Sequence, residues 1–143
     1  MANEPANRAD ITGVWILRTA FLENLETGTR VPLPPTKGVL MLHASGRMMA
    51  LLTPANQEPA ETEPEQAAAY KLTNAYSGRY RLEGLDRFVT TVDFCLWQSW
   101  LGSEQARTYK LTEKTLDIIT DPHRFPLTGD ALMRSFVSWV REA

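Results

Sequence analysis

Side chains able to do chemistry gather in one strand-like stretch, residues 103–111. Within it Gln105, Arg107, Tyr109 and Leu111 stand at alternate positions, and alternate residues of a β-strand lie on the same face. An amide, a cation and a phenol therefore share a face with an apolar residue that belongs in a core. Such a face is typical of a cavity wall, a buried polar network or a binding site.

Two residues of the preceding strand-like segment, Thr91 and Asp93, are expected to face this set, because antiparallel neighbours bring side chains together in pairs. An Arg107–Asp93 pair could be structural and hold two strands in register. It could also orient the carbonyl or carboxylate of a ligand, because arginine presents a planar fork of donors. We therefore expect an interior pocket with Arg107, Asp93 and Tyr109 as its catalytic polar groups, and with Tyr80, Thr91, Trp97, Leu40 and Met48 as its substrate-binding wall.

No other motif points to a particular reaction. The histidines, His43 and His123, lie before a hairpin turn and in a proline-rich loop, without metal-ligand spacing, although the loop of His123 could border a cavity. Cys95 is the only cysteine, which fits a reducing compartment. The sequence contains no nucleophile triad, glycine-rich phosphate loop or convincingly paired carboxylates. We expect no metal and no organic cofactor, so any catalysis would rest on shape, desolvation and hydrogen bonds.

Composition is that of an ordinary globular domain. The 143 residues are 43% hydrophobic and 22% charged. The net charge of −2 argues against nucleic acid as a partner, because phosphate binding needs a basic face. No apolar run approaches the ~20 residues of a membrane span, and residues 1–10 lack the apolar core of a signal peptide. We expect a cytoplasmic protein, monomeric or homodimeric, with a disordered tail over residues 1–10 and one domain over 11–143.

Hydrophobic residues recur mostly with a period of two, which is the period of β-strands. Thr62 and Glu65 form a capping-box pattern around Pro64, which predicts a short helix. Eight antiparallel strands can close into a barrel that holds one small ligand, whereas a two-sheet sandwich has the same local pattern. The predicted strands cover residues 14–23, 38–43, 47–53, 76–82, 87–97, 103–111, 115–120 and 131–141, and the helix, inserted between the third and fourth strands, covers 63–75.

Several short motifs resemble those of lipocalins, and more specifically of the small single-domain lipocalin-like proteins of microbes. The matching places are Gly13 with Trp15 in a Gly-x-Trp pattern, the hairpin over residues 38–46, the helix leading into 76–80, the block 100–107 and the terminal 134–139. Their order and spacing carry the resemblance over nearly the whole chain, from about Ile11 to Arg141. The resemblance implies an all-β fold: an eight-stranded antiparallel barrel with an interior cavity.

The resemblance also implies two local features. Trp15 should close one end of the barrel, with Arg134 or Arg141 of the last strand near its ring. Many relatives carry a histidine midway along the fifth strand, where this chain has Thr90 and Thr91. Proton transfer by that histidine therefore cannot be carried over.

Three functions fit these observations. The first is an enzyme, without a metal or organic cofactor, that isomerises, cyclises or dehydrates an apolar natural product or metabolite in the barrel cavity. The second is a non-catalytic carrier of a hydrophobic metabolite. The third is a filled barrel that serves only as a structural or dimerising module. The first two share one partner, a hydrophobic small molecule.

Overall fold

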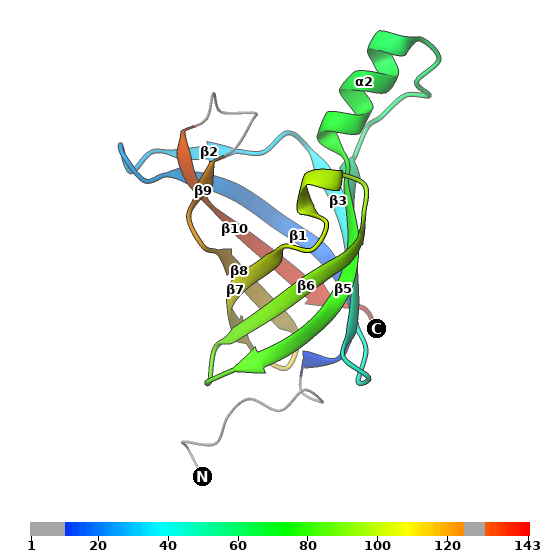
Figure 1. Ribbon diagram of the computed structural model, residues 1–143. Coiled ribbons are helices and arrows are strands. Elements are labelled where there is room, and N and C mark those ends of the chain that lie inside the picture. The colour runs from blue at the N-terminus through cyan, green and yellow to red at the C-terminus, as the bar shows by residue number, and fades with distance from the viewer. Residues whose placement is uncertain (1–10, 125–130) are drawn as a thin grey trace.

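The computed structural model describes residues 11–124 and 131–143, in which ten strands form one antiparallel sheet (Figure 1). The two short strands, β2 and β9, extend its edges at one end of the barrel. The strands are β1 (Gly13–Asn24), β2 (Arg30–Pro32), β3 (Thr36–Leu42), β4 (Arg47–Pro54), β5 (Asn74–Glu83), β6 (Arg87–Cys95), β7 (Glu104–Leu111), β8 (Thr115–Thr120), β9 (His123–Arg124) and β10 (Leu132–Arg141).

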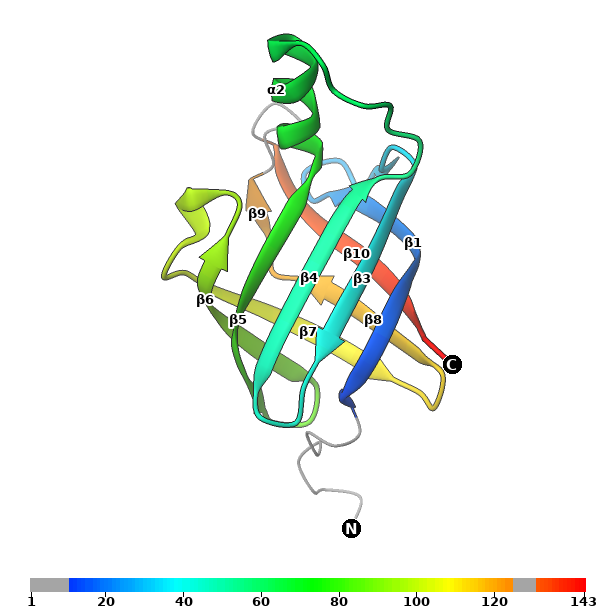
Figure 2. The same ribbon diagram turned by 90° about the vertical axis from the view of Figure 1, so that its right-hand side faces the viewer.

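Pairing between β1 and β10 closes the eight long strands into a barrel, as Figure 2 shows from the side. This pairing runs from Trp15 opposite Arg141 to Asn24 opposite Met133, and it is interrupted by a register shift between Leu17 and Thr19. Pairing of β1 with β3 covers only four residue pairs, after which β1 pairs with β2 instead. The predicted eight-stranded antiparallel barrel is therefore confirmed, and the sandwich is excluded.

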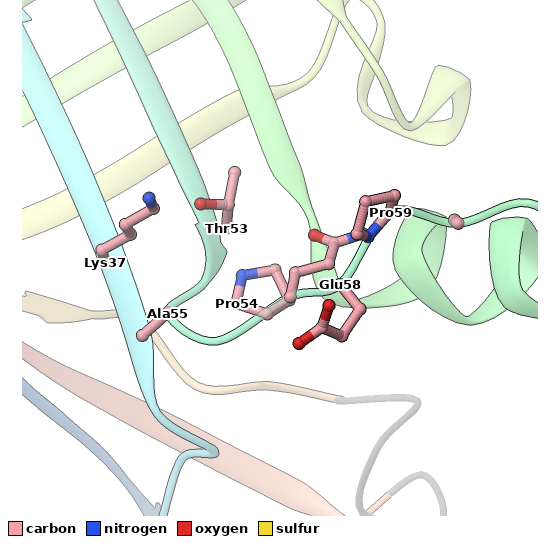
Figure 3. A pocket seen from close by; sticks show the side chains of 8 residues that line it. Lys37, Thr53, Pro54, Ala55, Glu58 and Pro59 are labelled. Atoms are coloured by element: carbon pink, nitrogen blue, oxygen red, sulfur yellow. The ribbon is translucent and has the colours of Figure 1, made fainter.

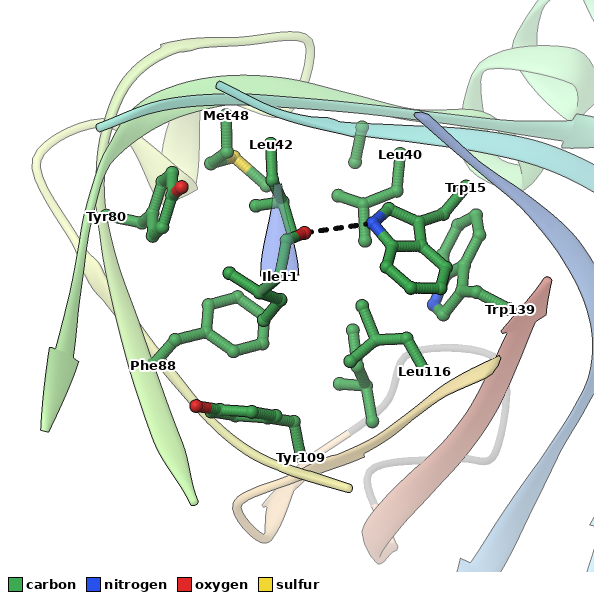
Figure 4. Packing of buried hydrophobic residues seen from close by; sticks show 12 residues of the cluster. Ile11, Trp15, Leu40, Leu42, Met48, Tyr80, Phe88, Tyr109, Leu116 and Trp139 are labelled. Atoms are coloured by element: carbon green, nitrogen blue, oxygen red, sulfur yellow. Dashed lines mark hydrogen bonds between the residues drawn. The ribbon is translucent and has the colours of Figure 1, made fainter. Parts of the chain in front are cut away.

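One end of the barrel is filled by a hydrophobic core. Trp15 is 0% exposed, and its indole N–H donates to the carbonyl oxygen of Ile11 at 3.1 Å. The guanidinium carbon of Arg141 lies 4.2 Å from the centre of the Trp15 ring, as the resemblance implied. Figure 4 shows Ile11 among the surrounding core side chains, which are Trp15, Leu40, Leu42, Met48, Ala50, Tyr80, Phe88, Tyr109, Leu116, Ile118 and Trp139.

The other end carries the helix α2 (Glu63–Leu72), which projects away from the barrel (Figures 1 and 2). The predicted capping box is present, because Glu65 N–H donates to Thr62 Oγ1 and Thr62 N–H donates to Glu65. No residue of α2 is buried. Two bonds near Tyr70 attach the helix to the end of β6: the Trp97 indole donates to Tyr70 O at 3.2 Å, and the Tyr70 hydroxyl donates to Leu96 O at 3.4 Å.

Element boundaries differ from the prediction in a few places. The helix ends at Leu72 rather than at residue 75, because Thr73 is extended and β5 begins at Asn74. β6 ends at Cys95, and the 3-10 helix η1 (Gln98–Trp100) follows. The short strands β2 and β9 were not predicted. The predicted tail over residues 1–10 and residues 125–130 of the proline-rich loop that contains His123 lie outside the described residues.

Candidate functional site

The strand register determines which side chains face the barrel interior. Residues paired across a ladder lie on the same face, so the buried Trp15 places Leu40 of β3 and Ala50 of β4 inside with it. Applied around the barrel, the same rule separates its interior into two halves. The core fills one half, and the other half, which we call the open half, lies toward the end that carries α2.

On four neighbouring strands, β6, β7, β8 and β10, five polar side chains face inward in the open half. Thr90 is paired with Gln105, Arg107 is paired with Thr120, and the Thr120 and Ser135 hydroxyl oxygens are 2.9 Å apart. We call this set the polar stripe, and its members are Thr90, Gln105, Arg107, Thr120 and Ser135.

The facing side of the open half is apolar. It is formed by β1, β3, β4 and β5, whose inward residues here are mostly small or aliphatic; Thr36 and Asn74, where β3 and β5 begin, are polar exceptions. We call the apolar set the apolar wall, and its members are Ala20, Leu22, Gly38, Leu52 and Tyr76. A molecule between the two surfaces would meet hydrogen-bonding groups on one side and hydrocarbon on the other.

Part of the open half keeps some exposure to solvent. Leu17, Ala20 and Val137 face inward by their register and lie about midway along their strands, yet none of the three is fully buried. Arg107 and Gln105 are also only partly buried. In contrast, the core residues at the closed end are almost entirely buried. Leu22, Thr90, Thr120 and Ser135 of the same half are 1%, 1%, 7% and 7% exposed, so solvent reaches only part of it.

Arg107 is the charged member of the polar stripe. Its guanidinium donates to its neighbour's carbonyl, Ala106 O, at 3.1 Å and to Gln105 Oε1 at 3.4 Å. No carboxylate of the described residues lies within ion-pair distance of it. The positive charge of Arg107 also acts on Asp121. A hydrogen bond from Arg87 is the main cause that lowers the pKa of Asp121, and the charge of Arg107 lowers it to a smaller degree.

A chain of hydrogen bonds fixes the amide beside Arg107. Gln105 Nε2 donates to Ser103 Oγ at 2.8 Å, and Ser103 Oγ donates to Trp100 O at 2.6 Å. The Trp100 ring packs edge-on against Tyr76, with centroids 5.1 Å apart. The amide oxygen of Gln105 is thereby turned toward Arg107, and the chain ties the polar stripe to the rim of the barrel.

The predicted pairing of Arg107 with Asp93 is wrong. Asp93 and Thr91 are exposed on the outer face of β6, because Phe88, Thr90 and Val92 take the inward positions. Asp93 instead forms an ion pair with Arg47 at 2.6 Å, and the hydrogen bond from Arg47 lowers its pKa. Thr91 and Asp93 therefore do not line the interior.

Four further residues of the predicted pocket, three from its wall and the catalytic candidate Tyr109, belong to the packed core. Leu40, Met48, Tyr80 and Tyr109 are each at most 6% exposed. The Tyr80 hydroxyl donates to His43 O at 2.9 Å, and the Tyr109 ring packs at 5.9 Å from that of Phe88. These side chains fill the closed end rather than border an open space.

Trp97 and the histidines lie around the periphery. Trp97 is partly exposed at the rim and packs edge-on against Trp100. His123 is paired with the buried Met133, so it lies on the inner face of β9 at the open end. His43 is exposed at the opposite end, in the β3–β4 turn, with its ring nitrogen 2.9 Å from Ser45 Oγ.

Three residues of the polar stripe were missed by the sequence analysis. Thr90, Thr120 and Ser135 are 1%, 7% and 7% exposed, so they are buried polar residues at inward positions. For Thr120 the alternation with Leu116 and Ile118 was a usable signal. Thr90 carried no such signal, because both faces of β6 mix apolar residues with threonine.

Two surface depressions lie outside the barrel interior. One, of about 400 Å³, is formed where the segment after β4 folds past Lys37 and Thr53, with Glu58 on its far side (Figure 3). The other, of about 660 Å³, lies beside Val14, Met41 and Met49 near the closed end.

Among residues 11–124 and 131–143, no group of three or more histidine, cysteine, aspartate or glutamate side chains is arranged to hold a metal ion. The same residues include no helix of the length and apolarity needed to cross a membrane.

A closed eight-stranded antiparallel barrel with a packed end and an accessible end is the architecture of the barrels that hold one small molecule. The chain belongs to the Lipocalin-like domain family, whose sequence model matches residues 13–141. The resemblance drawn from the Gly-x-Trp pattern and the later motifs is therefore confirmed. No curated protein shows significant sequence similarity to the chain.

Proposed function

We propose that this protein binds a hydrophobic small molecule in the open half of its barrel. The observation that supports this most directly is the division of the interior into a polar stripe and a facing apolar wall, both beyond the packed core. Binding pockets are mostly apolar surfaces with a few convergent polar groups, and the open half has this composition. The ligand enters at the α2 end and lies with its polar edge toward β6, β7, β8 and β10.

A matched pair of variants tests the location of the site. In Ala20→Phe a ring would occupy the open half, because Ala20 faces inward opposite Val137. In Ala106→Phe the same ring lies on the outer face of β7, because Ala106 is paired with Val89, whose neighbours Phe88 and Thr90 face inward. We expect the neutral fluorescent probe 1-aminoanthracene to bind the parent and Ala106→Phe alike, and to bind Ala20→Phe at least tenfold more weakly. Equal binding by all three folded proteins would place the probe elsewhere.

A second candidate function is an isomerase- or cyclase-type reaction on the bound molecule. Two observations favour it: the inward guanidinium of Arg107 could stabilise a developing enolate, and His123 lies on the inner face at the mouth. Asp93, the expected partner of Arg107, is on the outside of the barrel. The supported roles are therefore charge stabilisation by Arg107 and proton transfer by His123.

Mass spectrometry of the bound compound separates the two functions. The protein is incubated with a metabolite extract, purified again, and its bound compounds are compared with those in the extract. A compound recovered unchanged identifies a carrier. A compound that is isomeric with an extract component, formed by the parent and not by His123→Ala or Arg107→Met, identifies an enzyme.

A further inference from the structure

We propose that the ligand carries a carboxylate, and that the Arg107 guanidinium binds this group on the inner wall of the barrel. The proposal rests on the proposed function and makes it specific, because it names the chemical class of the molecule. It would be an apolar acid, with its hydrocarbon body against the apolar wall and its carboxylate on the polar stripe.

The first argument is charge. Among the described inward positions of the open half, Arg107 is the only lysine, arginine, aspartate or glutamate. Of the other described arginines at the barrel's open end, Arg30 and Arg134 lie over the outward rings of Phe21 and Phe136, and Arg124 is exposed, next in sequence to the inward His123. A partly buried cation is costly unless a counter-charge or several acceptors compensate it. Arg107 has no carboxylate of the described residues within ion-pair distance.

The second argument is hydrogen-bonding capacity. A guanidinium carries five N–H donors in a fixed fork, and Arg107 uses two nitrogens, one in a 3.1 Å bond and one in a long 3.4 Å bond. The remaining capacity suits a planar acceptor with two oxygens, and a carboxylate meets such a fork in a bidentate arrangement. A neutral carbonyl would satisfy some donors and leave the positive charge uncompensated. The carboxylate is therefore the better partner.

The third argument is the surrounding set of donors. Thr120 Oγ1 accepts from Ser135 N–H at 2.9 Å and also shares a proton with Ser135 Oγ. Whichever hydroxyl donates in that pair, the other hydroxyl keeps a proton that it can give to a ligand oxygen. Thr120 is the register partner of Arg107, so this proton is available beside the guanidinium. On the other side, Gln105 is a positioning residue, because its bond to Ser103 fixes the amide oxygen that accepts from Arg107.

The test compares an acid with its own ester. The probes are 11-(dansylamino)undecanoic acid and its methyl ester, which share a chain and a fluorophore and differ in the charge of one end. We expect the parent protein to bind the acid at least about tenfold more tightly than the ester, because charge-assisted hydrogen bonds are the stronger ones. In Arg107→Met the preference should disappear, so that this variant binds the acid no more tightly than the ester. Arg79→Met, at an exposed position of β5, is the matched control and should keep the preference.

Each outcome bears on one of the two proposals. If the parent binds acid and ester equally, the carboxylate proposal is wrong and the proposed binding function stands. If Arg107→Met keeps the preference for the acid, another group binds the carboxylate and the assignment to Arg107 is wrong. If the parent binds neither probe, the proposed function itself fails. Arg107→Lys is measured as well, because it keeps the charge without the fork; it should keep part of the preference, which separates loss of charge from misfolding of the Met variant.

Discussion

Among single residues, Thr90 departs most clearly from the rule that buried polar groups are hydrogen-bonded. It is 1% exposed, and its hydroxyl has no partner among the described residues. Valine has nearly the same shape and needs no partner, so we expect Thr90→Val to raise the free energy of unfolding by about 1 kcal/mol in urea titrations. Thr120→Val is the control and should lower it by about the same amount, because the Thr120 hydroxyl is bonded to Ser135. Destabilisation by Thr90→Val would show that its hydroxyl has a partner.

Trp15 is the residue on which the closed end depends most. It is fully buried, bonds Ile11 through its indole N–H, and lies under the Arg141 guanidinium. We expect Trp15→Ala to lower the free energy of unfolding by ~3–5 kcal/mol, the usual cost of a large-to-small core change, measured by far-ultraviolet circular dichroism in urea. Trp97→Ala, at the partly exposed rim, should cost clearly less. A loss below 1 kcal/mol for Trp15→Ala would contradict its place in the core.

Alternation predicted the inward position of Arg107 and misplaced its partner. On β7 the apolar Leu111 marks one face, so Arg107 and Gln105 could be assigned to the interior with it. On β6 neither face is marked in this way, because Val89, Thr91 and Asp93 alternate with Phe88, Thr90 and Val92. If the inward positions of a strand are assigned one residue out of step, every side chain of that strand is placed on the wrong face. Asp93 was assigned to the interior for that reason.

At the scale of elements, the eight long strands and the helix could be predicted from the sequence because each combines a period-two pattern or a capping box with clear turn residues. The short strands β2 and β9 have three and two residues, too few to show a period. The register shift in β5 between Ser77 and Gly78 was not predictable either. There a Cβ on residue 78 would lie 2.2 Å from Thr91 O, so the close approach of the two backbones requires glycine.

The helix α2 behaves as an element with its own stability. It buries none of its residues, so its capping box and two bonds near Tyr70 hold it in place. We expect Thr62→Ala to weaken the helix by about 1 kcal/mol, which would speed amide hydrogen exchange in residues 65–72 roughly fivefold. The free energy of global unfolding should not change, since the barrel does not rest on α2. Thr29→Ala, in the turn after β1, should leave exchange in α2 as it is. A lower global stability for Thr62→Ala would mean that α2 is coupled to the barrel.

At the scale of the whole molecule, stability and binding are assigned to different ends of one barrel. The closed end holds the tryptophans, tyrosines and leucines of the core, and the open end holds the polar stripe and the apolar wall. Substitutions in the stripe should therefore change binding more than folding. Around the outside, ion pairs link neighbouring parts of the sheet: Arg47 with Asp93, Arg81 with Glu104, Arg87 with Asp121, and Arg134 with Glu23.

These ion pairs make the stability of the barrel depend on acid pH. Arg87 donates to both carboxylate oxygens of Asp121, at 3.2 Å and 3.0 Å, and this bonding holds the pKa of Asp121 below its ordinary value. A carboxyl whose pKa is lower in the folded state stabilises the fold above its unfolded pKa, about 3.9 for aspartate. That contribution is lost as the pH falls through the lower folded value.

We therefore expect the parent protein to be slightly more stable than Arg87→Met at pH 7; the difference is small because the pair is largely exposed. This difference should start to shrink as the pH falls below about 4, the pKa of aspartate in the unfolded chain, and should be lost as the pH falls through the lower folded pKa of Asp121. Urea titrations at a series of pH values measure it, and carboxyl NMR should show a higher pKa for Asp121 in the variant. In an Asp121→Asn background, Arg87→Met should have an effect that does not vary with pH. A difference between parent and Arg87→Met that stays constant down to pH 3 would show that Arg87 stabilises the barrel through packing of its aliphatic stem rather than through its charge.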